Sequence, residues 1–145
     1  MHKRTMENEI AGHEFWSPDG KMIWFDLQMP RGKTFYLAGV SLETGKEVRY
    51  QLQRNEWSIH YTINAEQTLF AGDGADSAHV AKGDDASWIY LFKPEGDHFS
   101  STRLVTMKHH QYHLEPNVHF SPDGKWIIFR SNMFGPTNVF AVRIL

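Results

Sequence analysis

Short runs of apolar residues alternate with clusters of turn residues along the whole chain. The clearest run, at 15–25, reads Phe-Trp-Ser-Pro-Asp-Gly-Lys-Met-Ile-Trp-Phe, and it returns at 119–129 as His-Phe-Ser-Pro-Asp-Gly-Lys-Trp-Ile-Ile-Phe. A weaker copy at 60–70 reads His-Tyr-Thr-Ile-Asn-Ala-Glu-Gln-Thr-Leu-Phe. Pro sets φ early in a turn and Gly adopts positive φ without steric cost, so each copy predicts two strands joined by a tight turn.

The runs that follow each turn are rich in β-branched and aromatic residues, which favours further strands. The predicted strands are 22–27, 34–40 and 47–52, then 58–63, 68–71, 88–92 and 102–107, then 117–121, 126–131 and 138–144. No window carries a sustained apolar stripe with a period of 3.6 residues, so little helix is expected. We take Trp16, Trp57 and Trp88 as core residues, with sugar stacking as the alternative use of one of them.

Aligning Asp19, Asn64 and Asp123 gives spacings of 45 and 59 residues, close to the roughly 40–50 residues of a four-stranded propeller blade. The predicted fold is all-β: a β-propeller fragment of about three four-stranded antiparallel blades in one domain, 1–145, with units 11–53, 54–108 and 109–145. Known propellers close with about four to eight blades. We therefore expect a piece of a longer chain, or self-association through the open blade edges.

Composition removes several classes of function. A net charge of −2 gives no general attraction to nucleic acid or to an anionic membrane, and no apolar run approaches a membrane span of roughly 20 residues. The chain has no cysteine, which excludes disulfides, thiolate zinc sites and cysteine nucleophiles. The polar segment 72–87 is a long insertion in the second unit, and long loops are often functional. A cytoplasmic location is expected, with the periplasm as the alternative if a signal peptide precedes this sequence.

Histidine is the residue type that carries candidate chemistry, because four of the nine histidines lie within 109–119. If that segment is extended, His113, Glu115, Asn117 and His119 share one face, although Pro116 makes an undisturbed strand unlikely. Imidazole, carboxylate and amide oxygen could together hold a divalent ion such as Mn²⁺. Hydrogen bonding across strands is the alternative use of these histidines. Arg130 could grip a carboxylate if it faces the channel.

The ordered motifs resemble one family, the oligogalacturonate lyases. The resemblance rests on His-Glu-Phe-Trp-Ser-Pro-Asp-Gly at 13–20, Ser-Ile-His at 58–60 followed by Gly-Asp-Gly-Ala-Asp at 72–76, and Pro-x-x-x-Phe-Ser-Pro-Asp at 116–123. It covers almost the whole chain and places it in the carboxy-terminal blades of a seven-bladed, TolB-like propeller. The family cleaves short oligogalacturonates by β-elimination with Mn²⁺ in the site.

The resemblance implies roles for individual residues. His13 corresponds to a metal-binding histidine, whereas Tyr112, Glu115 and Asn117 stand where the family has Gln, His and His. Glu115 and Asn117 can still supply oxygen ligands, and Gln111 or His113 can replace missing ones. We assign His60 and Arg130 to substrate binding. The family's base and substrate-gripping arginine lie in blades outside this chain.

The expected function is therefore the carboxy-terminal part of a metal-assisted oligogalacturonide lyase in pectin degradation, with the isolated chain inactive. Its expected partner is the uronate substrate, with Mn²⁺ or another divalent cation as cofactor. The changes at Glu115 and Asn117 motivate an alternative, a non-catalytic TolB-like scaffold that binds protein or glycan. A third interpretation is a different polysaccharide lyase or glycoside-active enzyme on the same propeller.

Overall fold

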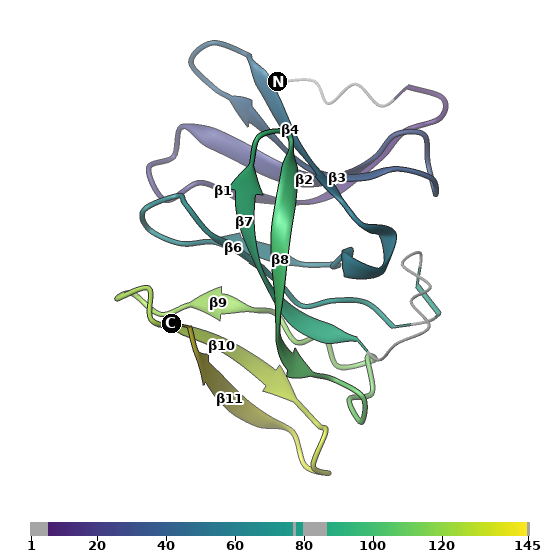
Figure 1. Ribbon diagram of the computed structural model, residues 1–145, viewed down its shortest axis with the longest axis vertical. Coiled ribbons are helices and arrows are strands. Elements are labelled where there is room, and N and C mark those ends of the chain that lie inside the picture. Colours follow the sequence, from purple (N-terminus) through teal and green to yellow (C-terminus); the bar gives the residue numbers. More distant parts are fainter. Residues whose placement is uncertain (1–5, 77, 80–86, 145) are drawn as a thin grey trace.

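The fold is described by a computed structural model that covers residues 6–76, 78–79 and 87–144. Eleven strands and one turn of 3-10 helix are present in these residues. Figure 1 shows the strands in three successive groups, from the blue strands at the top of the view to the yellow-green strands at the bottom. The predicted all-β architecture is confirmed, and most predicted strands are found within a few residues of their expected bounds.

The first group is an antiparallel sheet of four strands in chain order: β1 (Ile10–Trp16), β2 (Met22–Gln28), β3 (Phe35–Ser41) and β4 (Glu47–Leu52). The second group follows the short helix η1 (Arg54–Glu56) and is again in chain order: β5 (Tyr61–Ile63), β6 (Phe70–Gly72), β7 (Trp88–Glu95) and β8 (His98–Thr106). The outer strands β4 and β8 meet through a single parallel pair, Gln51 with His98. This pair links the two groups in the order β1-β2-β3-β4-β8-β7-β6-β5. Each group is called a sheet below, because buried side chains of both groups form one core cluster.

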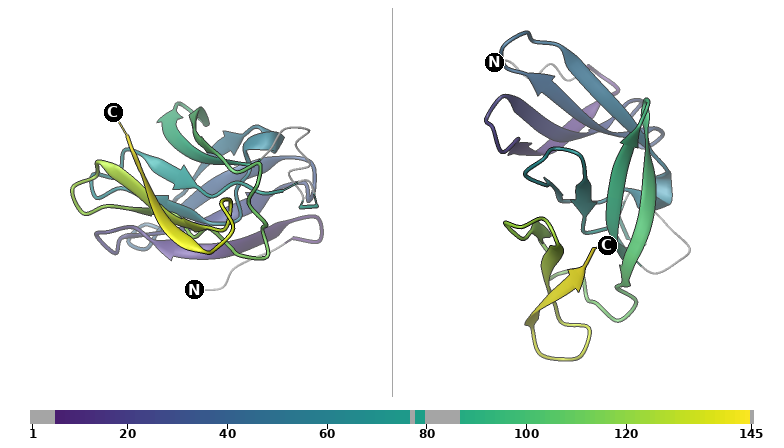
Figure 2. Two further views of the ribbon diagram at one scale, coloured as in Figure 1. Left: turned by 90° about the horizontal axis from the view of Figure 1, so that it is seen from below. Right: turned by 60° about the vertical axis from the view of Figure 1, so that its left-hand side comes forward.

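The third group has three strands in the described residues: β9 (His119–Phe120), β10 (Trp126–Ser131) and β11 (Asn138–Arg143). The first strands of successive groups contact one another, β1 with β5 and β5 with β9. The two views of Figure 2 show the groups fanned about this shared side. Four-stranded antiparallel sheets that radiate from their first strands are the arrangement of a propeller.

Two apolar layers hold the three sheets together. The layer between the first two sheets is largely aromatic and contains Trp24, Phe35, Trp57, Phe70, Phe92 and Phe99 among its buried members. The layer between the second and third sheets contains Ala71, Ile89, Met107, Val118, Ile127 and Phe129. Aromatic side chains fill such wide gaps because each can bury about 150–250 Å².

Trp16 was expected in the core, and this prediction is wrong: the residue is 60% exposed. Its neighbour Phe15 packs against the aromatic layer, and successive side chains of a strand point to opposite faces. In the described chain, the first sheet has a second sheet against one face only. Trp16 lies on the other face, so Trp24 from β2 takes the core position instead.

The Ser-Pro-Asp-Gly turns form as their residues dictate. Ser17 Oγ donates to Asp19 Oδ1 at 2.6 Å and accepts the Met22 amide at 2.9 Å, while Gly20 adopts a φ of 69°. The hydrogen bonds that Asp19 accepts, first from Ser17 and then from the Gln67 side chain and the Lys21 amide, lower the pKa of Asp19 to about 2. The turn at 121–125 repeats the same bonds, with Ser121 donating to Asp123 at 2.6 Å. Each turn thereby fixes the register of its two strands.

Candidate functional site

The middle turn shows which residues of the three units are equivalent. The amide of Asn64 donates to the Leu69 carbonyl at 3.0 Å, as Ser17 does to Met22 and Ser121 to Trp126, both at 2.9 Å. Asn64 therefore corresponds to Ser17 and Ser121, and the alignment of Asn64 with Asp19 and Asp123 was wrong. The sequence misled because Gln67, with a φ of 58°, takes the left-handed position that glycine fills in the other two turns.

The corrected register places three polar residues at one repeated position, four residues before each turn. These residues are His13, His60 and Asn117. His13 and Asn117 both have left-handed backbones, with φ of 48° and 49°. In β1 this conformation coincides with a bulge between Gly12 and Phe15. Bulges re-aim side chains beside functional sites, and His and Asn tolerate the left-handed region better than most residues.

A second repeated position lies 13 residues further along and holds Asp26, Asp73 and Arg130. Asp26 is buried, and its Oδ1 accepts a hydrogen bond from His13 Nδ1 at 3.0 Å. Asp73 is fully buried, and its Oδ2 accepts from His60 Nδ1 at 2.8 Å. Two His–Asp pairs thus stand at equivalent places in successive sheets. Each pair leaves the Nε2 atom of its histidine for another partner.

In the third unit the same two positions are filled differently. Arg130 Nε donates to the backbone carbonyl of Glu115 at 2.7 Å, and the Arg130 amide donates to the Pro116 carbonyl at 3.0 Å. The arginine therefore fixes the segment that carries Glu115 and Asn117. It holds this segment by its backbone and leaves the carboxylate of Glu115 for other contacts.

The two histidines and the third unit meet at one cavity of about 210 Å³, lined by His13, Glu14, Phe15, His60, Tyr61, Asn117, Val118 and His119. The rings of His13 and His60 lie edge to face, with centroids 5.1 Å apart. His60 Nε2 is 3.9 Å from Glu115 Oε2. Imidazole and carboxylate groups from all three units therefore converge here.

The charges around His60 favour its protonated form. Its hydrogen bond to Asp73 raises the pKa of the ring, burial opposes the rise, and Asp73, Glu115 and Asp26 add favourable charge. Burial raises the pKa of the Tyr112 hydroxyl, which keeps its proton and donates to the Gly74 carbonyl at 3.0 Å. The site is thus acidic around a pair of imidazoles, a setting that attracts cations.

The residues proposed from the sequence are divided by the structure into two groups. His13, His60 and Asn117 line the cavity, and Glu115 and Arg130 lie next to it. Gln111 and His113 are exposed, and neither lines this cavity; the Gln111 amide donates to Asn132 Oδ1 at 2.9 Å. The alternation that an extended segment 113–119 would give does not form, because β9 begins only at His119 and Asn117 is left-handed. The effect of Pro116 was anticipated correctly.

Sequence reasoning missed Asp26 and Asp73. A signal for them existed, since a histidine is followed 13 residues later by an aspartate in both of the first two units. Asp73 entered the sequence analysis only as a member of the 72–76 motif, whereas the structure shows that its carboxylate binds His60. Residues 77 and 80–86 of the polar insertion lie outside the described residues.

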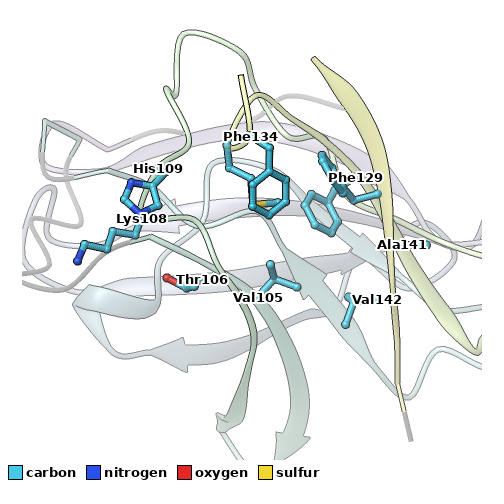
Figure 3. Close-up of a pocket in the computed structure, with 10 residues that line it drawn as sticks. Val105, Thr106, Lys108, His109, Phe129, Phe134, Ala141 and Val142 are labelled. Carbon is cyan, nitrogen blue, oxygen red and sulfur yellow. The ribbon is translucent and has the colours of Figure 1, made fainter. Parts of the chain in front are cut away.

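A second cavity, of about 370 Å³, lies between the second and third sheets on the side of β11. Figure 3 shows the rings of Phe129 and Phe134 beside Val105 and Val142, with His109 and Lys108 at one side. Its walls are mostly apolar and bring together no carboxylates. The smaller cavity at His13 and His60 is therefore the candidate site.

The candidate site suits a divalent cation in the kind of donors it offers. Metal-binding histidines usually donate their second ring N–H to a carboxylate, as both histidines do here. Carboxylate and amide oxygens of Glu115 and Asn117 complete a mixed nitrogen and oxygen set. Over 6–76, 78–79 and 87–144, however, no three His, Asp or Glu side chains lie close enough together to hold a metal as they stand.

Radiating four-stranded sheets with paired histidines at the inner strands define a β-propeller-type protein. Comparisons with known proteins confirm the resemblance drawn from the sequence. The oligogalacturonide lyase of Pectobacterium atrosepticum is 27% identical over 153 residues, which cover 98% of this chain and 39% of that protein. The oligogalacturonate lyase of Dickeya dadantii is 24% identical over the same shares. The chain therefore spans about two fifths of the length of these relatives.

Solved structures support the same fold. An oligogalacturonate lyase in complex with manganese matches with a TM-score of 0.79 at 21% identity, over 99% of this chain and 37% of that one. The oligogalacturonate lyase of Vibrio parahaemolyticus also matches at 0.79, with 20% identity over 99% and 38%. TolB from Acinetobacter baumannii matches at 0.67, with 15% identity over 94% and 32%. No protein-family model matches the chain.

Proposed function

We propose that this chain forms the cation- and uronate-binding part of an oligogalacturonate-lyase-like enzyme that cleaves short pectin-derived oligogalacturonides by β-elimination. The observation that carries the proposal is the pair of His–Asp contacts at one cavity, His13 with Asp26 and His60 with Asp73. Similarity to oligogalacturonate lyases along 98% of the chain supports the substrate class. A cytoplasmic location stays a prediction from the sequence.

His13 and His60 would hold the cation through Nε2, with oxygen donors from Glu115 and Asn117. A bound divalent cation supplies charge that neutralises a uronate carboxylate and stabilises the negative charge that develops as the neighbouring C–H proton leaves. Asp26 and Asp73 keep the two imidazoles oriented for that task. Arg130 holds the Glu115 segment at the cavity edge through the backbone.

The decisive experiment is a hybrid enzyme. This chain replaces the matching segment of the Pectobacterium atrosepticum lyase, and the hybrid is incubated with digalacturonate and Mn²⁺ while ultraviolet absorbance of the unsaturated product is followed. We expect activity in the hybrid and its loss in a hybrid carrying His13→Ala. An inactive hybrid that is folded and binds no Mn²⁺ would contradict the proposal.

One observation favours a second candidate function, a propeller module that binds acidic glycan or protein without chemistry. The described residues contain no ready-made set of three metal-binding side chains. Calorimetric titration of the chain with digalacturonate separates the two functions. Binding that requires Mn²⁺ and is abolished by a chelator supports the lyase part, whereas binding that is unchanged by the chelator supports the metal-free module.

A further inference from the structure

Asp73 holds His60 at two points. Its Oδ1 accepts the backbone amide of His60 at 2.9 Å, and its Oδ2 accepts the ring Nδ1 at 2.8 Å. The Asp73 amide in turn donates to the His60 carbonyl at 3.2 Å. Asp73 is fully buried, whereas the His60 side chain is 25% exposed toward the cavity. The carboxylate thus lies behind the ring, and the cavity lies in front of it.

We infer that Asp73 is a positioning residue that locks the neutral His60 ring in its Nδ1–H tautomer and turns the Nε2 lone pair toward Glu115 and the cavity, where it can accept a cation. This inference deepens the proposed function and rests on it for the identity of the ligand. The tautomer itself depends only on the contacts of this chain.

The hydrogen-bonding roles of carboxylate and imidazole explain why Asp73 fixes the tautomer of His60. An ionised carboxylate only accepts hydrogen bonds, so the ring nitrogen facing it must carry the hydrogen. In a neutral imidazole the other nitrogen then has the lone pair. Tyr112 also contacts the Asp73 carboxylate, but its hydroxyl keeps its proton and donates to the Gly74 carbonyl, so it adds a donor beside Asp73 and removes no acceptor from His60. His60 therefore offers a nitrogen lone pair on its cavity side whenever it is neutral.

The double contact makes Asp73→Asn an unusually sharp test. The His60 backbone amide can only donate, so it requires the side-chain oxygen of Asn at the place of Oδ1. The Asn NH₂ group must then face Nδ1, which has to become the acceptor. The ring is driven to the Nε2–H tautomer, and its lone pair turns away from the cavity. In serine proteases the same exchange at the orienting aspartate lowers kcat by about 10⁴-fold.

The tautomer can be read directly by ¹H–¹⁵N NMR of the histidine ring in the full chain, with the pH raised until the ring is neutral, because the contact with Asp73 raises the pKa of His60 above the ordinary value. We expect the protonated nitrogen of His60 to be Nδ1 in the wild type and Nε2 in Asp73→Asn. Asp76→Asn is the matched control, since Asp76 contacts His79 and should leave the His60 signals unchanged. An Nε2–H tautomer in the wild type would overturn the inference without any variant.

Cation affinity provides the second readout, with Mn²⁺ titrated by electron paramagnetic resonance. Asp73→Asn is expected to weaken Mn²⁺ binding by about 10–100-fold, the usual range for a residue that orients a ligand, while Asp76→Asn is not. If the tautomer switches but the wild type binds no Mn²⁺, the proposed function fails and the positioning role stands. If Mn²⁺ binds and Asp73→Asn changes neither tautomer nor affinity, the positioning role fails and the proposed function stands.

Discussion

The ring of His60 lies edge to face against the ring of His13, with centroids 5.1 Å apart and planes at 76°. The two histidines are 47 residues apart in the chain but occupy the same position in successive sheets. Contact between the first strands β1 and β5 brings them together. Equivalent residues of successive units therefore come into contact, and this is how a propeller brings ligands from distant parts of the sequence to one site.

Removing either histidine of this pair should weaken cation binding. Each of His13→Ala and His60→Ala is expected to lower Mn²⁺ affinity by at least about 10-fold, because each deletes a nitrogen donor already oriented by an aspartate. Isothermal titration of the full chain at neutral pH measures the change. His98→Ala, an exposed histidine on β8, is the control. Equal affinities in all three variants would count against a site at the cavity.

Gly39 is a position where no side chain fits. A Cβ atom there would lie 2.6 Å from the ring of Trp24, which is itself buried and packs against Phe70 with centroids 4.8 Å apart. We expect Gly39→Ala to lower the free energy of unfolding by about 1–3 kcal/mol, the usual cost of overpacking a core. Urea denaturation followed by tryptophan fluorescence measures this.

The control for that change is Gly45→Asn, a left-handed turn position with no atom within 4 Å of its Cβ. Asn is among the residues that tolerate this conformation, so the free energy of unfolding should change by less than about 0.5 kcal/mol. Similar losses in the two variants would show that the contact with Trp24 is not the cause.

Gln67 adopts a φ of 58° where Gly20 and Gly124 adopt 69° and 68°. A left-handed conformation costs a non-glycine residue about 1–2 kcal/mol, and the greater freedom of glycine in the unfolded chain offsets part of the gain. Gln67→Gly should therefore stabilise the protein by about 0.5–1 kcal/mol in urea denaturation. The reverse exchange, Gly124→Gln, should destabilise it by about 1 kcal/mol. If Gln67→Gly and Gly124→Gln changed the free energy of unfolding in the same direction, this explanation would be refuted.

The same substitution has a second, independent readout. A hydrogen bond from Gln67 is the second largest cause, after that from Ser17, of the lowered pKa of Asp19. Losing it should raise the pKa of Asp19 from about 2 toward its ordinary value near 3.8. Titration of the Asp19 carboxyl by NMR measures the change in its pKa. Gly124→Gln, which keeps Gln67, is the comparison.

His110 should make stability depend on pH. Its Nε2–H donates to the Leu114 carbonyl at 2.7 Å, Nδ1 lies 2.9 Å from Ser131 Oγ, and burial lowers its pKa below the ordinary 6.5. The Leu114 carbonyl and Asp73 act in the opposite direction, and His113 adds to the lowering. The unfolded chain then binds the proton more readily. Stability from His110 is present above about pH 6.5 and is lost as pH falls toward its folded pKa.

Urea denaturation at about pH 8 and about pH 5, on either side of the histidine range, measures this dependence. The acid-induced loss of stability should shrink in His110→Gln relative to the wild type. His60 contributes with the opposite sign, since its raised pKa gives stability below its ordinary pKa that is lost as pH rises through the folded value. An unchanged loss in His110→Gln would refute the assignment to this residue.

Much of the architecture could be read from local chemistry. The turns at 17–21 and 121–125 form within five residues, through bonds from Ser17 and Ser121 to the next aspartate and strand. Such contacts depend on neighbouring residues only, so the motif predicts them wherever it occurs. The strand periods and the propeller-type array follow from the same repeated motif.

Only part of the candidate site could be predicted from the sequence. His13, His60, Asn117, Glu115 and Arg130 were proposed together with Gln111 and His113, which lie outside the cavity. His113 was grouped with the site by an alternation that the left-handed Asn117 breaks, and Gln111 was named only as a replacement ligand in the family comparison. Asp26 and Asp73 were overlooked, because Gln67 in a glycine position hid the true register of the middle turn. Strand periodicity assumes an extended backbone, and it fails wherever φ becomes positive.

Local sequence by itself determined the strands, the turns and their repetition, because hydrogen bonds between near neighbours and the pattern of apolar residues suffice for these. Only the tertiary structure decided that His13 and His60 touch, that Asp26 and Asp73 lie behind them, and that Glu115 faces the second histidine. Those contacts join residues 13 to more than 50 positions apart, and packing of whole sheets brings them together. It also decided that Trp16 is exposed, since which face of a sheet is covered depends on the next sheet.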